Sequence, residues 1–538
     1  MKSATKGTFN LVLGLVLGIL VGTLGLQLFS SSPTVDAYEK LESVLKTVEE
    51  NYVDDVATDE VIESAIAGML DRLDPHSVYI PAEQFARVEE DFRGSFEGIG
   101  IEFDVIRDTI TVVAAISGGP SERLGIISGD KIVVIDGEDA VGISRDEVPK
   151  RLKGERGTTV NVGIRRPGTD RTLDFSIIRD EIPLTTVDAA FVTDNGTAYI
   201  KVNRFADPTY EEFVAKMAEL QSDGMKRLVL DLRGNPGGYM DRAVRMADEL
   251  IGGKQRLVFT KSPRSANEVV YRSQDGQAYE SLPLIVLVSP GSASASEILA
   301  GAVQDLDRGL IVGETTFGKG LVQRQFRLPD SSAFRLTIAR YYTPSGRLIQ
   351  RPYSDDDRSA YYSLENRQRR AEGENVTHEG DDSTGASETY FTVSGRKVIG
   401  GGGITPDYIV RPDTLSAESG AWEIITNNVI WEYVEGYMAS EGEQLRASYG
   451  DGVDRFVRDY AVSSAMFARF LDLAETKGVR LNREKIAQDR SLLKGRIKAR
   501  IARAIWGDNA FYRVALQTDR QFRTAMTLFD EAIRIASR

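Results

Sequence analysis

The chain has 538 residues, of which 41% are hydrophobic and 27% charged, a composition typical of a globular protein with several domains. It has no cysteine and only two histidines, His76 and His378, which excludes a thiol nucleophile, disulfides, Cys-ligated metals and a histidine-rich metal site. The formal net charge of −14 disfavours nucleic acid as a partner.

An apolar run over residues 9–29 is long enough for a helix that crosses a membrane. Lys2 and Lys6 precede it, so the positive-inside rule places the N-terminus in the cytoplasm and the rest of the chain outside. We expect residues 1–35 to form a cytoplasmic stub and an anchor, with a cleaved signal peptide as the alternative. Glycines at every fourth position of the run would let two anchors pack closely, which makes a homodimer possible. These are Gly14, Gly18 and Gly22.

Residues 36–93 keep a helical spacing of apolar side chains and predict an N-terminal helical region. Residues 94–180 change to short β-type runs separated by turns rich in Gly, Pro and Asp, and predict a small, mostly β domain. Residues 181–352 alternate strand and helix patterns, which favours an α/β core with a mainly parallel sheet.

Residues 353–389 form an insert whose acidic part, 371–388, is too polar to bury a core, so we expect a flexible loop. Order is expected to resume at residues 390–411, which we assign to the same core. Residues 412–538 predict a C-terminal helical domain. Six basic residues lie between 490 and 503, and a solvated helix face explains them better than a nucleic-acid or lipid surface.

Three segments carry residues suited to chemistry. The first, GSASASEILAGAVQDL (291–306), predicts a tight turn between a strand and a helix, where backbone N–H groups and the helix dipole favour an oxyanion. Ser292, Ser294 and Ser296 compete for the role of nucleophile, and a Ser-rich helix cap without chemistry is the alternative.

The second segment, GETTFGKGLVQ (313–323), resembles a phosphate-binding P-loop but has Gly320 where Ser or Thr is required, and a strand pattern follows it. A nucleotide site is therefore disfavoured. Lys319 in an apolar pocket would lose its charge easily and could act as a general base, whereas a surface lysine in a turn is the alternative.

The third segment, LVLDLRGNPGGYM (228–240), ends a strand in a glycine turn that could present N–H groups. Neither histidine is well placed for a Ser-His-Asp triad, although His76 stays possible, so Lys is the natural base.

In this order, DLRGNPGG, SASASEI and FGKGLVQ resemble the carboxy-terminal processing peptidases, or tail-specific proteases, of the S41 serine peptidases. LDPHSVY, YYTPSGRLIQ and GGGITPD fit the same family. The resemblance covers roughly residues 36–411. It implies Ser294 as nucleophile, Lys319 as base and Gln323 as the partner of the lysine. An oxyanion hole is implied at the N–H of Ala295 and of Gly238, with Gly237 as the alternative.

The resemblance also implies that residues 94–180 are a PDZ domain. Its carboxylate-binding loop would be GIGIEF, with Gly98, Ile99, Gly100 and Ile101 capturing a free C-terminus. Gly98 and Gly100 could also begin the G-x-G-x-x-G motif that binds dinucleotides. This interpretation is rejected, since Phe103 stands where the motif has its third glycine.

Together these observations predict a multi-domain α+β protein: a serine endopeptidase, anchored in the inner membrane of a bacterium, that acts on the periplasmic side. Its partners would be polypeptides with free apolar C-termini, and no metal or other cofactor is expected. If the N-terminus is cleaved, the protein would be exported and soluble. A membrane-tethered PDZ adaptor with a non-catalytic core is the alternative function.

Overall fold

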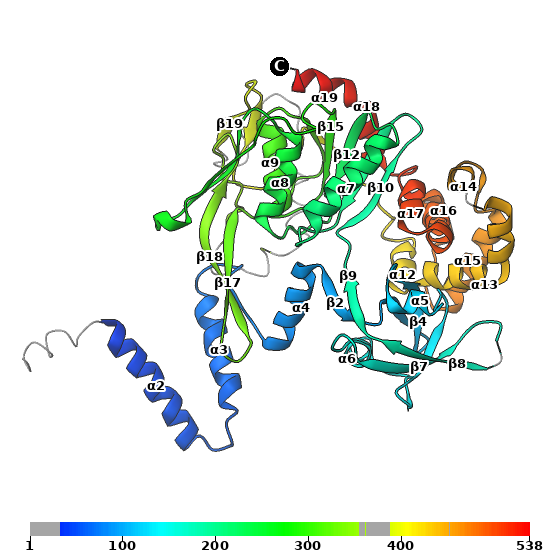
Figure 1. The fold of residues 1–538 in the computed structure, drawn as a ribbon, viewed down its shortest axis with the longest axis horizontal. Helices are drawn as coiled ribbons and strands as arrows, with labels where there is room; N and C mark the ends of the chain where they lie inside the picture. The colour runs from blue at the N-terminus through cyan, green and yellow to red at the C-terminus, as the bar shows by residue number, and fades with distance from the viewer. Residues whose placement is uncertain (1–32, 170, 354–360, 362–387, 451, 538) are drawn as a thin grey trace, which may run out of the picture. The chain divides into compact units, whose positions relative to one another are not determined.

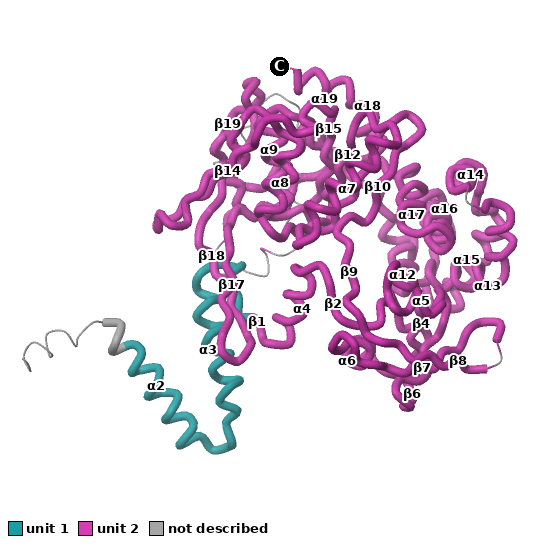
Figure 2. Tube along the Cα trace, viewed as in Figure 1, with its two compact units in different colours: residues 1–79 teal, residues 80–538 magenta. Residues whose placement is uncertain are grey.

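The computed structural model describes residues 33–538 except 170, 354–360, 362–387, 451 and 538. The chain divides into two compact units, Met1–Tyr79 and Ile80–Arg538 (Figure 2). The apolar run 9–29 and nearly all of the acidic insert lie outside the described residues. Within the described ranges, no helix has the length and apolar character needed to cross a membrane.

The first unit contains the two helices α2 (Pro33–Asn51) and α3 (Thr58–Leu70), where a helical region was expected. A loop follows in which the buried Asp74 accepts hydrogen bonds from its own neighbours. Its Oδ1 accepts the backbone N–H groups of His76 and Ser77 at 2.8 and 2.9 Å, and its Oδ2 accepts the Ser77 hydroxyl at 2.6 Å. The backbone of His76 thus belongs to a closed turn around a carboxylate.

A mostly β domain begins the second unit, after α4 (Ala82–Arg93). Its antiparallel sheet has the order β3-β4-β5-β7-β8, with β6 paired to β5. The strands are β3 (Ile101–Ile106), β4 (Thr109–Ala115), β5 (Lys131–Ile135), β6 (Glu138–Asp139), β7 (Thr159–Arg165) and β8 (Thr172–Ile178). Short helices α5 (Pro120–Arg123) and α6 (Glu147–Leu152) complete it, and β2 (Ser95–Gly98) pairs with β9 (Asp180–Pro183) where the chain enters and leaves.

The core is built on a six-stranded sheet of order β10-β11-β12-β15-β16-β21 (Figure 1). The strands are β10 (Val187–Val192), β11 (Thr197–Val202), β12 (Arg227–Asp231), β15 (Leu284–Val288), β16 (Leu310–Gly313) and β21 (Tyr408–Ile409). All pairs are parallel except β10 with β11. Because both faces of this sheet are covered, its strands β15 and β16 are apolar throughout rather than alternating.

One face of the sheet packs against α7 (Thr209–Ser222), α8 (Met240–Leu250) and α9 (Ala295–Asp305). The opposite face packs against the last two helices of the chain, α18 (Arg520–Thr527) and α19 (Phe529–Ala536). There, Tyr199 lies edge-on to Phe522 with ring centroids 5.8 Å apart. Helices thus cover both faces of the sheet.

A second sheet contains β13 (Arg256–Lys261), β14 (Val270–Arg272), β17 (Leu321–Arg327) and β18 (Ala333–Tyr342). The pairs β13–β14, β13–β18 and β17–β18 are antiparallel. The prediction of one mainly parallel core sheet is therefore incomplete, since residues 334–342 belong to this second, antiparallel sheet. A small hairpin, β19 (Thr389–Phe391) with β20 (Lys397–Ile399), follows the insert.

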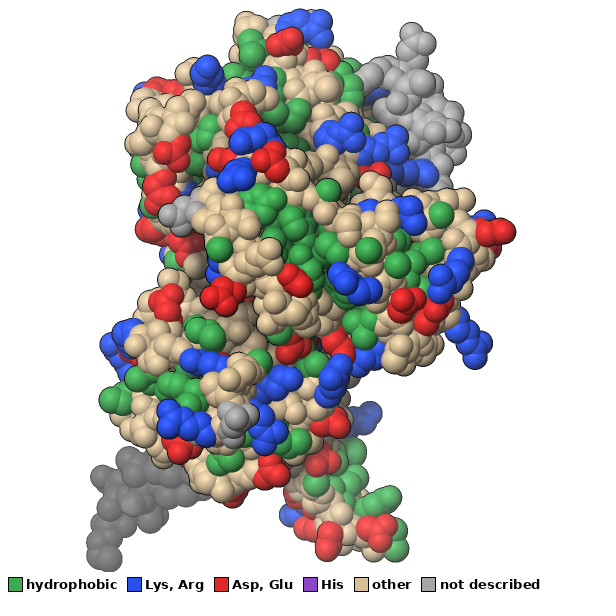
Figure 3. Space-filling model, turned by 90° about the vertical axis from the view of Figure 1, so that its right-hand side faces the viewer, with side chains coloured by type: hydrophobic (Ala, Val, Ile, Leu, Met, Phe, Trp, Pro, Cys, Tyr) green, Lys and Arg blue, Asp and Glu red, His purple; other side chains and the backbone are tan. Residues whose placement is uncertain are grey.

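The C-terminal region is helical, as expected, and most of it forms its own apolar core. Its helices are α12 (Ala421–Thr426), α13 (Val429–Tyr449), α14 (Val453–Asp459), α15 (Ser464–Thr476), α16 (Arg483–Trp506) and α17 (Asp508–Ala515). Leu493, Ile497 and Ile501 are buried, which explains their four-residue spacing on α16. Figure 3 shows the face on which these helices lie, where hydrophobic side chains gather near the middle among scattered charged ones.

Candidate active site

Ser294 lies at the junction of β15 and α9 in a backbone conformation that few residues adopt. Its φ is 55° and its ψ −111°, whereas L-residues other than glycine rarely have positive φ. Such strain persists only where the surrounding structure imposes it, and it clusters at functional sites. The half-buried Ser294 is therefore held in position by the turn rather than by its own preference.

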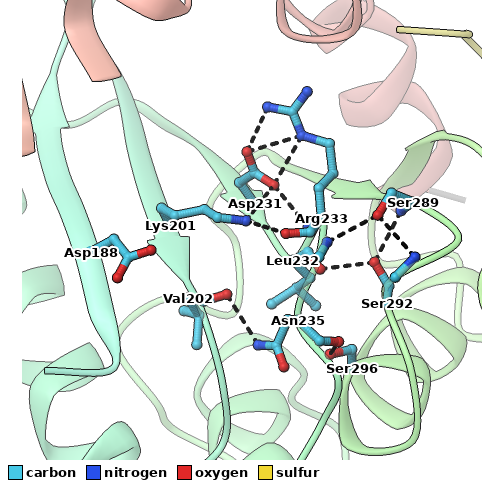
Figure 4. Close-up of polar contacts among 12 residues, drawn as sticks. Asp188, Lys201, Val202, Asp231, Leu232, Arg233, Asn235, Ser289, Ser292 and Ser296 are labelled. Carbon is cyan, nitrogen blue, oxygen red and sulfur yellow. Dashed lines mark hydrogen bonds and ion pairs between the residues drawn. The ribbon is translucent and has the colours of Figure 1, made fainter. Parts of the chain in front are cut away.

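The other two candidate serines fasten this turn to the neighbouring one (Figure 4). The Ser292 hydroxyl donates to the carbonyl of Leu232 at 2.8 Å and accepts the backbone N–H of Ser289 at 2.9 Å. The Ser296 hydroxyl donates to the carbonyl of Asn235 at 3.0 Å. Both side chains are buried, so the geometry favours Ser294 as the reactive serine.

The glycine turn after β12 is shaped by the buried Asn235. Its Nδ2 donates to the carbonyl of Val202 at 3.1 Å, and its Oδ1 accepts the N–H of Gly237 at 2.9 Å. Gly237 has φ +96°, and a Cβ there would lie 2.8 Å from Ser294 Cβ and 2.9 Å from the backbone nitrogen of Ala295. The turn therefore packs directly against the serine loop, at a distance only glycine permits.

Two backbone N–H groups near Ser294 are available to stabilise an oxyanion. Within the described residues, the N–H groups of Ala295 and Gly238 donate no hydrogen bond, whereas that of Gly237 is taken by Asn235. Ala295 is also the first residue of α9, where the helix dipole favours negative charge. The geometry thus favours Ala295 and Gly238 over Gly237.

Lys319 lies in the loop between β16 and β17 and is half-buried. Its Nζ donates to Oε1 of Gln323 at 2.7 Å, so the structure brings together the lysine and glutamine that the sequence paired. The buried Tyr341 hydroxyl donates to the carbonyl of Lys319 and lies 3.1 Å from that of Ser294. Tyr341 therefore joins the two loops, a role that the sequence reading missed.

Glu297, which the sequence reading also missed, is fully buried beneath the site and accepts four hydrogen bonds. Its Oε2 accepts the backbone N–H groups of Ser294 at 2.8 Å and Lys319 at 2.9 Å. Its Oε1 accepts the N–H of Gly318 at 2.6 Å and the Thr316 hydroxyl at 2.5 Å. One carboxylate thus fixes the backbone of Ser294 relative to that of Lys319. The spacing S-x-x-E of a capping box was the available signal.

We expect Glu297→Gln to lower kcat/KM about 100-fold, the effect of misplacing catalytic groups by as little as 1 Å, if Ser294 and Lys319 are the catalytic pair. A glutamine keeps one acceptor oxygen but turns an NH₂ group toward two of the four donors. Leaving buried donors without an acceptor should also lower the free energy of unfolding by about 2–3 kcal/mol. Peptide-cleavage kinetics and urea unfolding check both effects. An active, undiminished Glu297→Gln enzyme would show that this carboxylate does not position the site.

The pH dependence of stability tests the same residue. Burial raises the pKa of Glu297 from 4.5 to about 7, against the opposing effect of its hydrogen bonds. The folded state therefore binds the proton more tightly than the unfolded state. The stabilisation of the fold by the proton bound to Glu297 is complete below pH 4.5 and is lost as the pH rises through about 7. It amounts to about 3 kcal/mol. The difference in unfolding free energy between wild type and Glu297→Gln should change over this window; a constant difference would contradict the assignment.

Asp231, at the end of β12, organises a buried charge cluster behind the glycine turn (Figure 4). Burial alone would raise its pKa, but the charges of Arg233 and Lys201 hold it well below its usual value. Arg233 Nη2 lies 2.6 Å from Asp231 Oδ2, and the Tyr199 hydroxyl donates to the same oxygen at 2.7 Å. Arg233 also donates to Asp519 at the start of α18, at 2.7 Å. The turn is thereby tied to the C-terminal helices.

The loop expected to bind a peptide C-terminus lies between β2 and β3. Ile99 and Gly100 connect the strands, and Gly100 has φ +74°. The carbonyl of Ile99 accepts both the N–H and the hydroxyl of Ser121, at 3.1 and 2.6 Å. Within the described residues, the N–H groups of Ile99 and Gly100 donate no hydrogen bond, and β3 is an edge strand paired only with β4. This arrangement suits carboxylate capture with strand addition.

Comparison with known proteins decides the family. Residues 196–358 match the model of peptidase family S41, residues 98–177 that of the PDZ domain, and residues 27–84 the N-terminal domain of the activating protease CtpB. The carboxy-terminal-processing protease of Bartonella bacilliformis is 38% identical over 311 residues, which cover 57% of this chain and 71% of that protein. The chain belongs to the S41 carboxy-terminal processing proteases.

This S41 protease also resembles two relatives from Bacillus subtilis. The carboxy-terminal processing protease CtpB is 34% identical over 59% of this chain and 66% of its own length. The protease CtpA is 33% identical over 60% of this chain and 68% of its own length. The predicted family and enzyme class, a serine-type peptidase with a PDZ domain, are therefore confirmed. Residues 422–507 match the model of a family of unknown function.

The S41 protease offers no evident metal site in the part of the chain that the structure describes. No group of three His, Asp or Glu side chains lies close enough there to hold a metal ion.

Proposed function

We propose that this protein is a membrane-anchored endopeptidase that recognises the C-termini of polypeptides through its PDZ domain and cleaves them with a dyad of Ser294 and Lys319. The observation that carries the proposal is the shared carboxylate of Glu297, which accepts the backbone N–H groups of both Ser294 and Lys319. The hydrogen bond from Lys319 Nζ to Gln323 supports it, because it gives the lysine a fixed direction.

In the proposed mechanism, neutral Lys319 removes the proton from the Ser294 hydroxyl, and Ser294 Oγ attacks the scissile carbonyl carbon. The N–H groups of Ala295 and Gly238 stabilise the oxyanion of the tetrahedral intermediate. Lys319 then protonates the leaving amine, and an acyl-enzyme forms. A water molecule that gives its proton to Lys319 releases the acyl group. Because Lys319 acts only when neutral, activity should fall as the pH is lowered.

The PDZ domain selects the substrate in this proposal. The N–H groups of Ile99 and Gly100 receive the terminal carboxylate, and the peptide continues as a strand beside β3. The apolar side chains of the domain core, among them Ile99 and Ile101, favour an apolar last residue.

The apolar run 9–29 supports anchoring, with the catalytic part on the extracytoplasmic side of a bacterial inner membrane. Its glycine spacing supports pairing of two anchors into a homodimer.

Cleavage of an unfolded protein that ends in free apolar residues tests the proposed function. We expect the full chain, in detergent, to cleave it at least about tenfold faster than the same protein with an amidated C-terminus, since the carboxylate is the group the loop binds. The Ser294→Ala variant is the control for contaminating proteases. Equal rates for both substrates would remove the PDZ domain from substrate selection. Binding of the free tail without cleavage would favour the adaptor function instead.

A further inference from the structure

A cavity of about 440 Å³ lies where the C-terminal helices meet the catalytic core. Helices α13, α16 and α17 contribute most of its wall, and residues 518–520 and Arg233 close it. Its volume is within the range of sites that bind small molecules. The large apolar side chains that line it are Ile425, Ile430, Trp431, Leu492 and Phe511. Neither the proposed mechanism nor the PDZ domain uses this cavity.

Arginines surround the cavity in excess of carboxylates. Arg233, Arg496, Arg500 and Arg520 line it, against Asp413 and Asp519. Both carboxylates already have partners. Asp519 pairs with Arg233 at 2.7 Å and accepts the N–H of Phe522 at 2.8 Å, and Asp413 accepts the backbone N–H of Arg520 at 3.3 Å. Arg233 is already paired with Asp231 and Asp519, so the uncompensated positive charge of the cavity comes from Arg496, Arg500 and Arg520, which face only Asp413 among the lining acids.

Arg500 is the clearest case of this uncompensated charge. It is half-buried against the ring of Trp431, 5.3 Å from the ring centroid, and within the described residues it makes no hydrogen bond or ion pair. Burial and the charge of Arg503 lower its pKa, while Glu102, Asp508 and Asp104 act the other way from a distance. Burying a guanidinium without a partner is unfavourable, so an anion at this place would relieve the cost.

Trp431 supplies a second unused polar group in the wall. Its Nε1 is buried and has no acceptor among the described residues. A buried indole N–H normally finds a partner. This nitrogen is closed off by its surroundings, so the group that a ligand in the cavity can reach is the guanidinium of Arg500, while Arg496 and Arg520 are exposed at the same cavity.

We propose that this cavity binds a small amphipathic carboxylate, an alkyl chain that ends in a carboxyl group. The apolar wall, including the ring of Trp431, would hold the chain, and Arg500 with Arg496 would hold the carboxylate. A purely apolar ligand would leave the arginines unpaired. A protein helix, about 10 Å across, does not fit the available volume.

Binding of dodecanoate to the full chain, held in lipid nanodiscs, tests this site. We expect saturable one-site binding that changes the fluorescence of Trp431, with empty nanodiscs as background and Trp431→Phe losing the signal. The variant Arg496→Met with Arg500→Met should bind at least about tenfold more weakly, as expected when charge-assisted hydrogen bonds are lost. Each single variant should show a smaller loss. Lys494→Met, on the same helix but outside the cavity, should bind as the wild type does.

Dodecanol, which has the same chain without the charge, should also bind at least about tenfold more weakly than dodecanoate. Equal binding of dodecanoate by the wild type and the double variant would overturn the proposal, as would equal affinity for dodecanol. Tighter binding of a short apolar peptide than of dodecanoate would overturn the ligand class. The arginine variants remove only side chains without partners, so they should keep the unfolding temperature of the wild type. The binding measurement does not depend on peptidase activity.

Discussion

Lys319→Met should lower kcat/KM by at least about 1,000-fold, because it removes the base that we propose activates the serine while nearly keeping the length of the side chain. The carbonyl and N–H of residue 319 keep their bonds to Tyr341 and Glu297, so the loop should stay in place. Thermal unfolding should therefore shift little. Steady-state cleavage of an unfolded protein, with calorimetry on the same samples, measures both effects.

Ser294→Ala is the matched variant for this result. It should lose as much activity as Lys319→Met, and the double variant should lose no more than either, since two residues that act as one unit are strongly non-additive. Gln323→Ala should show a smaller loss, because in the proposed mechanism Gln323 orients the lysine through its hydrogen bond and does not contact the reacting atoms. Substantial proteolysis by purified Ser294→Ala or Lys319→Met would overturn the dyad.

Gly237→Ala should lower activity at least about 100-fold, the effect expected when an oxyanion hole loses a donor or its geometry. A Cβ at this position would lie 2.6 Å from the carbonyl oxygen of Ala293 and 2.8 Å from Ser294 Cβ, and the φ of +96° adds strain. The turn and the serine loop must separate to accommodate it. Cleavage kinetics should show a loss mainly in kcat, since the proposed binding of the substrate by the PDZ domain does not involve Gly237.

Gly234→Ala, in the same turn, is the control for backbone strain. Gly234 also has a positive φ, +71°, but nothing lies within 4 Å of a Cβ placed there. We expect a loss of stability of about 1 kcal/mol, the cost of a left-handed alanine, with activity retained. If both variants lost activity equally, strain in the turn rather than its contact with Ser294 would explain the effect.

The candidate reactive residues could be proposed from the sequence because the chemistry expected of them depends on local spacing. Ser294 follows an apolar strand and precedes a helix, and Gln323 stands four residues after Lys319 at the start of a strand. The resemblance to a known family then distinguished Ser294 from its two neighbours. The roles of the flanking serines became clear only in the structure, since both bind the turn after β12, about 60 residues earlier.

The residues that hold the site together could not be read from the sequence. Glu297 binds backbone N–H groups around residue 318, and Tyr341 reaches the site from the second sheet. An acid in a helix first turn and a tyrosine in a strand have many ordinary roles, and long-range partners leave no local pattern. The antiparallel sheet was missed for a similar reason, because alternation of apolar residues reveals a strand but not the direction of its neighbour.

The packing of helices α18 and α19 could not be predicted from the sequence either. Their amphipathic pattern predicts helices, but it does not say that they cover the catalytic sheet rather than join the other C-terminal helices. Phe522 and Phe529 pack on that sheet, and Asp519 binds Arg233 beside the glycine turn. The far end of the chain thus supports the site.

Covalent labelling of the full chain with a fluorophosphonate tests the central claim most directly, because the reagent reacts only with a serine that a base has activated. We expect a single adduct on the peptide that contains Ser294, absent in Ser294→Ala and strongly reduced in Lys319→Met. Peptide mapping by mass spectrometry locates it. An adduct on another serine, or undiminished labelling of Lys319→Met, would contradict a Ser294–Lys319 dyad.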